Sequence, residues 1–157
     1  YDVREVRIET LMELDEADFR ARSPSPGVTI RRGAMADLPA LIDLYADAGH
    51  MSRSAAGVER PLRDTRVWIA EQEGRIHSVA LTNAETTDLA MIGGVYTPPP
   101  QRGRGLSQAV CSALCAELLT VGKRPALYWD TPAAGSIYRK LGFRLVGEWR
   151  SLWLRHR

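Results

Sequence analysis

The segment that most constrains the fold of this chain is residues 95–110, which read VYTPPPQRGRGLSQAV. Its three consecutive prolines end any regular structure, because proline lacks the backbone N–H and fixes its own φ angle. Two arginines then alternate with two glycines, and from Leu106 onward apolar residues recur at helical spacing. The segment therefore predicts a strand, a glycine-rich basic loop and an amphipathic helix, in that order.

A loop of this composition before a helix is suited to holding an anion. Glycines let successive backbone N–H groups point into one concavity, and the helix adds its unpaired N–H groups and the positive end of its dipole. A diphosphate fits such an arrangement. The spacing is neither that of a Walker loop nor a dinucleotide-binding GxGxxG. On these residues alone, a plain tight turn or an arginine–glycine patch that contacts nucleic acid remain alternatives.

Size and composition favour one folded domain. The chain has 157 residues, of which 45% are apolar, enough for a proper core and too apolar for a disordered segment. No secretory leader is visible in the given residues, and no apolar run approaches the roughly 20 residues that span a bilayer, so we expect a cytoplasmic protein with no membrane partner. Cys111 and Cys115 share one helix face and predict a buried reduced pair. Three scattered histidines offer no metal-binding spacing.

The net charge of +2 conceals an asymmetry along the chain. Residues 1–100 hold 11 Lys and Arg against 16 Asp and Glu, a net charge of −5, whereas residues 101–157 hold 10 against 3, a net charge of +7. A basic C-terminal part favours an anionic ligand there.

The pattern of elements predicts an α+β fold. Residues 1–27 are expected to be an N-terminal tail and linker, or the end of a truncated preceding region, with residues 28–157 as the domain. The Ser-Pro steps and Gly27 mark the linker. We expect a strand at 28–33, a helix from Asp37 to Gly49, and either a second short helix or a mobile loop at 50–64. A hairpin at 67–71 and 76–82 is followed by a strand at 88–97, in which Gly93 and Gly94 mark a bulge or a close backbone approach. The rest is expected to be a helix from Leu106 to Gly122, a strand at 125–130, a helix between Thr131 and Gly142, and a final strand or hairpin.

Two motifs resemble the GNAT superfamily of acyl-CoA-dependent N-acyltransferases. The first is PxxRGRGLS between a strand and a helix, with Arg102, Gly105 and Ser107 at the motif positions; Ser107 departs from the usual Gly or Ala. The second is TPAAGSIYRKLGF, in which Thr131 replaces the common Asn. In this second motif the matching residues are Ala134, Tyr138, Gly142 and Phe143.

The resemblance covers roughly residues 28–155 and implies a mixed, mostly antiparallel twisted sheet with helices on both faces. LYWDT and EWRSLWL look most like the branch related to glycine N-acyltransferases. The resemblance also implies acetyl-CoA or another acyl-CoA as cosubstrate and no metal. The residues implied to bind it are Val95, Tyr96, Thr97, Arg102, Gly103, Arg104, Gly105, Leu106 and Ser107.

The resemblance implies a catalytic role for two side chains. Tyr138 is the candidate general acid for the departing thiolate, since a phenol with a pKa of about 10 stays protonated at neutral pH. Glu85 precedes the central strand, where many members of the family carry a carboxylate that acts as base. Asp88 and Asp130 are weaker candidates for the base, and the enzyme need not have a dedicated one. An oxyanion-stabilising N–H is expected near Val95.

The predicted function is transfer of an acyl group, most simply acetyl, to a primary amine of a small molecule or peptide. The alternative is a non-catalytic acyl-CoA-binding regulatory lobe of a longer tandem protein. The RGRG segment could instead belong to a nucleic-acid-binding module. The chain has no aromatic strand of the RNP type that such a module would use, so we expect no nucleic-acid partner. A homodimer is a further expectation. The resemblance places the acceptor pocket at residues 45–65 and 144–153, with Met51, Trp149 and Trp153 as lining residues.

Overall fold

A computed structural model describes residues 2–155 of the chain. One seven-stranded sheet runs through the molecule in the order β2-β3-β4-β5-β6-β1-β7, antiparallel except for the parallel pair β5 and β6. The strands are β1 (Asp2–Glu13), β2 (Thr29–Arg32), β3 (Val67–Gln72), β4 (Arg75–Glu85), β5 (Leu89–Tyr96), β6 (Arg124–Trp129) and β7 (Arg144–Arg155). The predicted α+β class and mixed sheet are confirmed.

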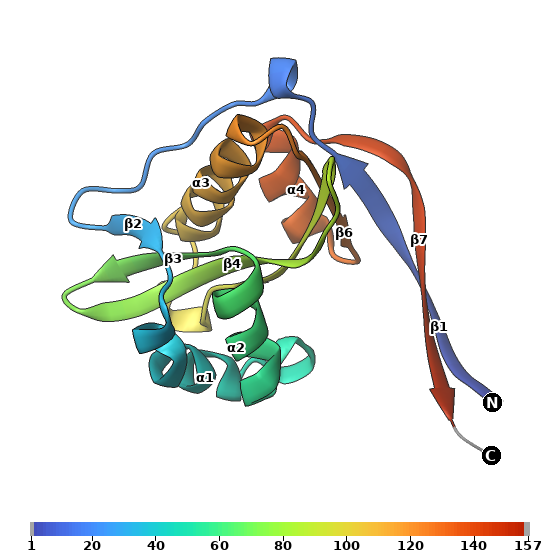
Figure 1. Cartoon of the computed structure of the whole chain (residues 1–157), viewed down its shortest axis with the longest axis horizontal. Coiled ribbons are helices and arrows are strands. Elements are labelled where there is room, and N and C mark those ends of the chain that lie inside the picture. The colour runs from blue at the N-terminus through green and yellow to red at the C-terminus, as the bar shows by residue number, and fades with distance from the viewer. Residues whose placement is uncertain (1, 156–157) are drawn as a thin grey trace.

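Four α-helices lie on the two faces of this sheet: α1 (Leu38–Ala46), α2 (Ala55–Asp64), α3 (Leu106–Thr120) and α4 (Pro132–Leu141). In Figure 1, α3 and α4 lie above the sheet and α1 and α2 below it. Each pair covers its own apolar cluster. The larger cluster lies under α3 and α4 and contains Leu114 and Leu127, and the smaller lies under α1 and α2 and contains Leu41 and Ile69.

Local sequence signals explain most of the element boundaries. Glu73 and Gly74 both have positive φ, as the tight β3–β4 turn requires. The side chain of Thr131 caps α4 by accepting from the Ala134 N–H, and Gly142 ends it at φ 103°. One boundary prediction was off, because α1 ends at Ala46 rather than at Gly49. Of the two alternatives for residues 50–64, the helix is correct: the stretch holds α2, capped by Ser54.

The expectation that residues 1–27 lie outside the domain is wrong for the first half of that segment. β1 lies between β6 and β7 and pairs antiparallel with both. Met12 and Leu14 are 1% and 0% exposed and belong to the core. Residues 20–27 are irregular, as expected of a linker. The correction follows from pairing across more than a hundred residues, which local patterns do not reveal.

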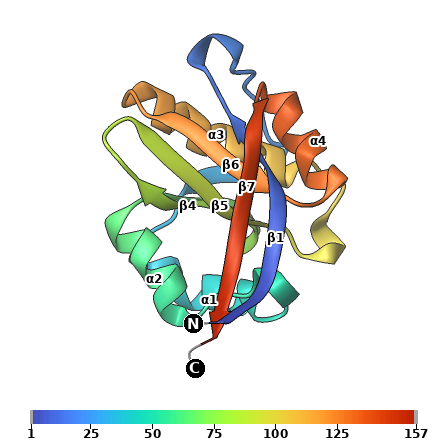
Figure 2. The same cartoon turned by 90° about the vertical axis from the view of Figure 1, so that its right-hand side faces the viewer.

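The C-terminal segment forms the single long strand β7 rather than a hairpin. Together β1 and β7 form a two-stranded ribbon that runs on past the rest of the sheet, as Figures 1 and 2 show, with Asp2 paired with Arg155 at its far end. No helix in residues 2–155 combines the length and apolarity needed to cross a membrane.

Candidate active site

An opening in the sheet lies where β5 and β6 part. These strands are paired in parallel only from Leu89 to Met91, opposite Arg124 to Ala126. Beyond that point β6 pairs with β1, through residues 126–129. In the described part of the chain, the later half of β5 therefore has no strand partner on the side of β6. Its backbone groups are available on that side to pair with an extended ligand.

A β-bulge changes the direction of the β5 backbone beside this opening. Gly93 lies opposite Leu81 and Tyr96 opposite Val79, so β5 carries one extra residue there. Gly94 has φ 57°, and a Cβ on it would come within 2.8 Å of Arg53 Nε and 2.9 Å of the Tyr45 hydroxyl oxygen. The Tyr45 hydroxyl donates to the Gly94 carbonyl oxygen. The predicted Gly93-Gly94 bulge is confirmed, and its position requires glycine for both conformation and space.

The glycine-rich loop meets the N-terminus of α3 beside this opening. Gly105 is the N-cap residue at φ 73°, and no side chain caps the helix. A Cβ added at Gly103 or Gly105 would meet nothing within 4 Å. The first N–H groups of this 15-residue helix thus have no side-chain cap among the described residues. This arrangement fits a phosphate or diphosphate, which would accept from those N–H groups.

The two arginines of the loop are held by neutral partners. Arg102 Nε donates to the Thr97 carbonyl oxygen at 2.9 Å. Arg104 donates to the side-chain oxygens of Gln101 and Gln72. Among the described residues neither arginine has a carboxylate within ion-pair distance, so their positive charge is available to an anionic ligand. A surface cavity of about 580 Å³ adjoins Arg104 and is lined by Gln72, Glu73, Arg75, His77, Gln101 and Arg104.

A chain of buried hydroxyls ties the end of β5 to α3. The Ser78 and Thr97 hydroxyl oxygens are 2.8 Å apart, and those of Thr97 and Ser107 are 2.7 Å apart. Ser78 is 0% and Thr97 7% exposed. The departure from Gly or Ala at position 107 thus has a physical reason, since the Ser107 hydroxyl fixes the first turn of α3 to the strand.

Tyr138 lies on α4, 7% exposed, with its ring edge-on to Phe143 at a centroid distance of 5.9 Å. It shares a cluster with Val95, Cys111 and Cys115. Burial raises the pKa of Tyr138, and the two cysteines add to that rise. Within residues 2–155 its hydroxyl has no hydrogen-bond partner. The group is therefore a protonated phenol whose donor is free to serve a ligand. Both cysteines are free and buried, as predicted.

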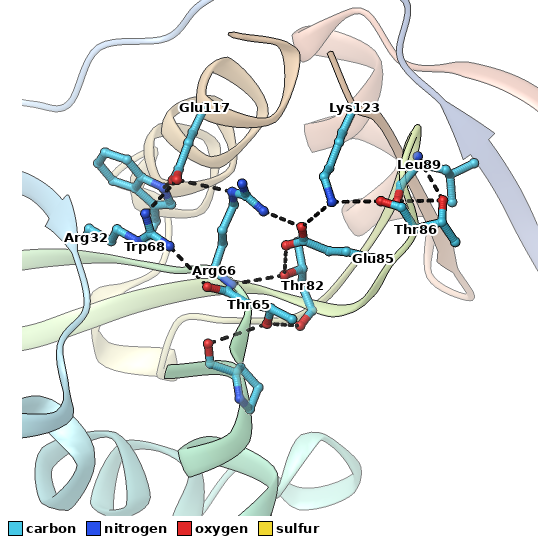
Figure 3. A network of polar contacts seen from close by, with 11 residues as sticks. Arg32, Thr65, Arg66, Trp68, Thr82, Glu85, Thr86, Leu89, Glu117 and Lys123 are labelled. Atoms are coloured by element: carbon cyan, nitrogen blue, oxygen red, sulfur yellow. Dashed lines mark hydrogen bonds and ion pairs between the residues drawn. The ribbon is translucent and has the colours of Figure 1, made fainter. Parts of the chain in front are cut away.

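Glu85 lies elsewhere, in the polar network of Figure 3. It forms ion pairs with Arg66 and, at 3.0 Å, with Lys123, and the Thr82 hydroxyl donates to it at 2.8 Å. Burial acts to raise the pKa of Glu85, but these three donors outweigh it and hold the pKa below its usual value. Glu85 pairs with Ala90 at the start of β5, the end away from Thr97.

The structure thus brings together most of the predicted residues but not Glu85. Val95, Thr97 and the loop from Arg102 to Ser107 meet where the opening reaches α3. Tyr96 contributes only its backbone, because its side chain stacks on Tyr45 in the cluster under α1 and α2, at 5.9 Å between ring centroids. Leu106 is 2% exposed and anchors the helix start in the core.

Sequence reasoning missed several residues on the other face of the opening. Arg53 donates to the Asn83 side-chain oxygen at 2.8 Å and lies over the Tyr45 ring. Tyr128 stacks on Trp149 with 5.0 Å between centroids. Burial raises the pKa of Tyr128; Glu9 raises it further and Arg53 lowers it, so both charges lie near its hydroxyl. No local pattern marks Arg53 or Tyr128, which come from the segment before α2 and from β6, whereas Trp149 is one of the expected lining residues of the acceptor pocket.

Comparison with known proteins agrees with this geometry. Residues 73–154, just over half of the chain, match the family described as FR47-like protein. An uncharacterised N-acetyltransferase of Streptomyces virginiae is 35% identical over 99 residues, which are 60% of this chain and 40% of that relative.

Among solved structures, a GNAT-family acetyltransferase of Novosphingobium aromaticivorans aligns with a TM-score of 0.76 and 23% identity, over 96% of this chain and 65% of that one. A Mycobacterium tuberculosis protein solved in complex with CoA aligns with a TM-score of 0.54 and 19% identity, over 60% of each chain.

The chain belongs to the FR47-like family, and its fold is that of the GNAT superfamily. The superfamily predicted from the two motifs is therefore confirmed. The chain spans 40% of the length of the Streptomyces relative and 65% of the Novosphingobium protein.

Proposed function

We propose that this chain is the catalytic domain of an N-acetyltransferase that moves the acetyl group of acetyl-CoA to a primary amine. The observation that carries the proposal is the opening between β5 and β6, with the uncapped N-terminus of α3 beside it. It offers backbone groups to an extended arm and N–H groups to a diphosphate, and CoA has both parts. The curated relative that is named as an N-acetyltransferase supports the same reading.

The residues that would hold acetyl-CoA follow from this geometry. The backbones of Val95, Tyr96 and Thr97 would pair with the pantetheine arm. The backbone N–H groups from Gly103 to Ser107 would bind the diphosphate, with Arg102 and Arg104 adding positive charge. The cavity beside Arg104, which also contains Arg75, suits a further phosphate. The thioester supplies an acyl group activated towards nucleophiles, and no metal is required.

Val95 and Tyr138 have the chemical roles in this proposal. The Val95 N–H follows the bulge and would stabilise the oxyanion that forms when the amine attacks. Tyr138 would give its proton to the departing thiolate. Its raised pKa keeps it protonated, and the missing hydrogen-bond partner leaves the proton free to transfer.

Glu85 is not retained as the general base in this mechanism. Its carboxylate is engaged by Arg66, Lys123 and Thr82, and its lowered pKa makes it a weak proton acceptor. We propose that the neutral fraction of the amine attacks and that its nitrogen then loses one proton to solvent as the amide forms; an α-amino group with a pKa of about 8 has an appreciable neutral fraction at physiological pH. Glu85 is then a structural residue of the α3 face.

The experiment that tests the function is Tyr138→Phe. We expect acetyl transfer, followed as thiol release, to fall about 100-fold, with CoA affinity and thermal midpoint little changed. Retained CoA binding with no transfer by the native protein, over a broad amine panel, would instead favour the non-catalytic CoA-binding lobe. Unchanged transfer in the variant would remove Tyr138 from the mechanism.

We also propose the glycine N-acyltransferase-like branch for this chain, with an acceptor that carries a carboxylate beside its amine. Arg53 supports this: it is half-buried beside Gly94, and among the described residues it has no carboxylate within ion-pair distance. A planar guanidinium held by Asn83 and Tyr45 is suited to bind a carboxylate.

Matched acceptors test the carboxylate proposal. An amino acid should be a better acceptor than its amide, which has the same amine but no carboxylate. In Arg53→Gln the KM for the amino acid should rise about tenfold or more, while the KM for the amide stays unchanged. Equal effects on both acceptors would contradict the assignment.

A further inference from the structure

The two edges of the sheet differ sharply in how they are protected. The edge strand β2 has four residues, and its Arg31 and Arg32 form ion pairs with carboxylates of other elements. The edge strand β7 has 12 residues and pairs only with β1. Short, charged edges resist pairing with another chain, and long apolar edges invite it.

The side chains of β7 strengthen this contrast. Six of its apolar residues are between 37% and 67% exposed: Leu145, Val146, Trp149, Leu152, Trp153 and Leu154. They lie on both faces of the ribbon, so no single helix of this chain covers them. Exposed apolar residues gathered along one strand are typical of an interface.

The charges of β7 are complementary to those of a second copy of the same strand. Glu148 and Arg150 lie two residues apart, on the same face, on either side of Trp149. They are 62% and 67% exposed, and they touch each other at 3.4 Å. An antiparallel copy of the same strand, centred on Trp149, would place each Glu148 directly opposite Arg150 of the second copy.

We propose that β7 is a dimer interface that pairs antiparallel with β7 of a second copy about a two-fold axis at Trp149. In this register, Gly147 meets Ser151 and the two Trp149 residues face each other. Beyond these five residues, Leu152 and Trp153 of each copy extend over Val146 and Leu145 of the other, where β7 carries its own bulge. Apolar residues thus meet apolar residues, and opposite charges meet.

Three neighbouring registers place like charges opposite each other. With a two-fold axis perpendicular to the sheet, residues that lie opposite each other have their side chains on the same face. Side chains alternate between the two faces along a strand, so the central residue must lie opposite its own copy in the second chain. Centring the pair on Glu148 sets the two glutamates against each other. Centring it on Arg150 does the same for the two arginines. Centring it on Gly147 sets Arg144 against Arg150. The Trp149 register avoids all three like-charge contacts.

A charge-swap series tests the interface. Light scattering coupled to size exclusion, over a concentration series, should show a dimer for the native protein. Glu148→Arg and Arg150→Glu should each weaken the dimer about tenfold or more, since two attractive pairs become repulsive. The double variant E148R/R150E should restore it, because opposite charges meet again with exchanged signs.

The matched control is the exposed Glu59–Arg63 ion pair on α2. Glu59→Arg should leave the dimer unchanged. A native protein that stays monomeric over the whole series would overturn the proposal, as would a dimer indifferent to both single variants. If the single variants weakened the dimer and the double variant did not restore it, the register centred on Trp149 would be wrong.

Discussion

At the scale of single residues, Gly94 is a constrained position within the proposed site. Its φ of 57° and the nearness of Arg53 and Tyr45 to its missing Cβ leave room for no side chain. We expect Gly94→Ala to lower the free energy of unfolding by about 1–3 kcal/mol and to displace the Val95 N–H from its working position. Chemical denaturation with an activity assay measures both effects.

Gly74→Ala is the control for that substitution. Gly74 has a similar φ of 71°, but nothing lies within 4 Å of an added Cβ. It should show only the cost of the unusual backbone conformation, with activity retained. Equal stability losses at the two positions would mean that the contacts with Arg53 and Tyr45 do not constrain Gly94.

Glu85 gives a prediction about pH. Its pKa is lowered in the folded state, so its ion pairs stabilise the protein above the unfolded pKa of about 4.5. This contribution is lost as pH falls through the lower folded pKa. Glu85→Gln should therefore be less stable at neutral pH, and its thermal midpoint should fall less steeply than that of the native protein on acidification below about pH 5.

That comparison also separates a structural from a catalytic role for Glu85. If Glu85 acted as the base, the substitution would abolish transfer at a temperature where the variant is still folded. We expect transfer to persist there. If the thermal midpoints of the variant and the native protein fell equally steeply on acidification, the polar network of Figure 3 would not be a source of stability.

At the scale of elements, β1 is the least expected feature, and a pair of substitutions on it tests its place in the sheet. Met12 is 1% exposed and accepts from the Trp129 indole N–H at 3.1 Å, whereas Val6 is 52% exposed. Met12→Ala should cost about 2–5 kcal/mol of stability, and Val6→Ala within about 0.5 kcal/mol. Denaturant unfolding measures both. Equally small losses of stability in the two variants would mean that β1 is a tail that does not contribute to the core.

The elements show which parts of the fold are predictable from sequence. Signals within a few residues, such as Glu73-Gly74 or the Thr131 cap, set boundaries correctly. The place of β1 depends on partners near residues 128 and 149, which no local pattern specifies. Two short motifs predict the loop and Tyr138 as site residues. The ion pairs of Glu85 could not be predicted from the sequence, because its partners Arg66 and Lys123 are distant from it along the chain.

At the scale of the whole molecule, the charge asymmetry has a structural interpretation. Lys123, Arg124 and Arg144 of the basic C-terminal part form ion pairs with Glu85, Glu13 and Asp18 of the acidic N-terminal part. The asymmetry along the chain is therefore partly balanced within the fold. Arg102 and Arg104 of the loop have no carboxylate within ion-pair distance among the described residues, and they lie at the proposed diphosphate site.

The most direct test of the central claim is thermal unfolding of the protein with CoA, with pantetheine and with ATP. At about 100 times the dissociation constant, binding adds about 2.7 kcal/mol, and the midpoint should rise by about 2–4 °C per kcal/mol. We expect a clear rise with CoA, which offers both arm and diphosphate, and much smaller changes with the other two. A midpoint that CoA leaves unmoved would contradict a CoA site between β5 and β6.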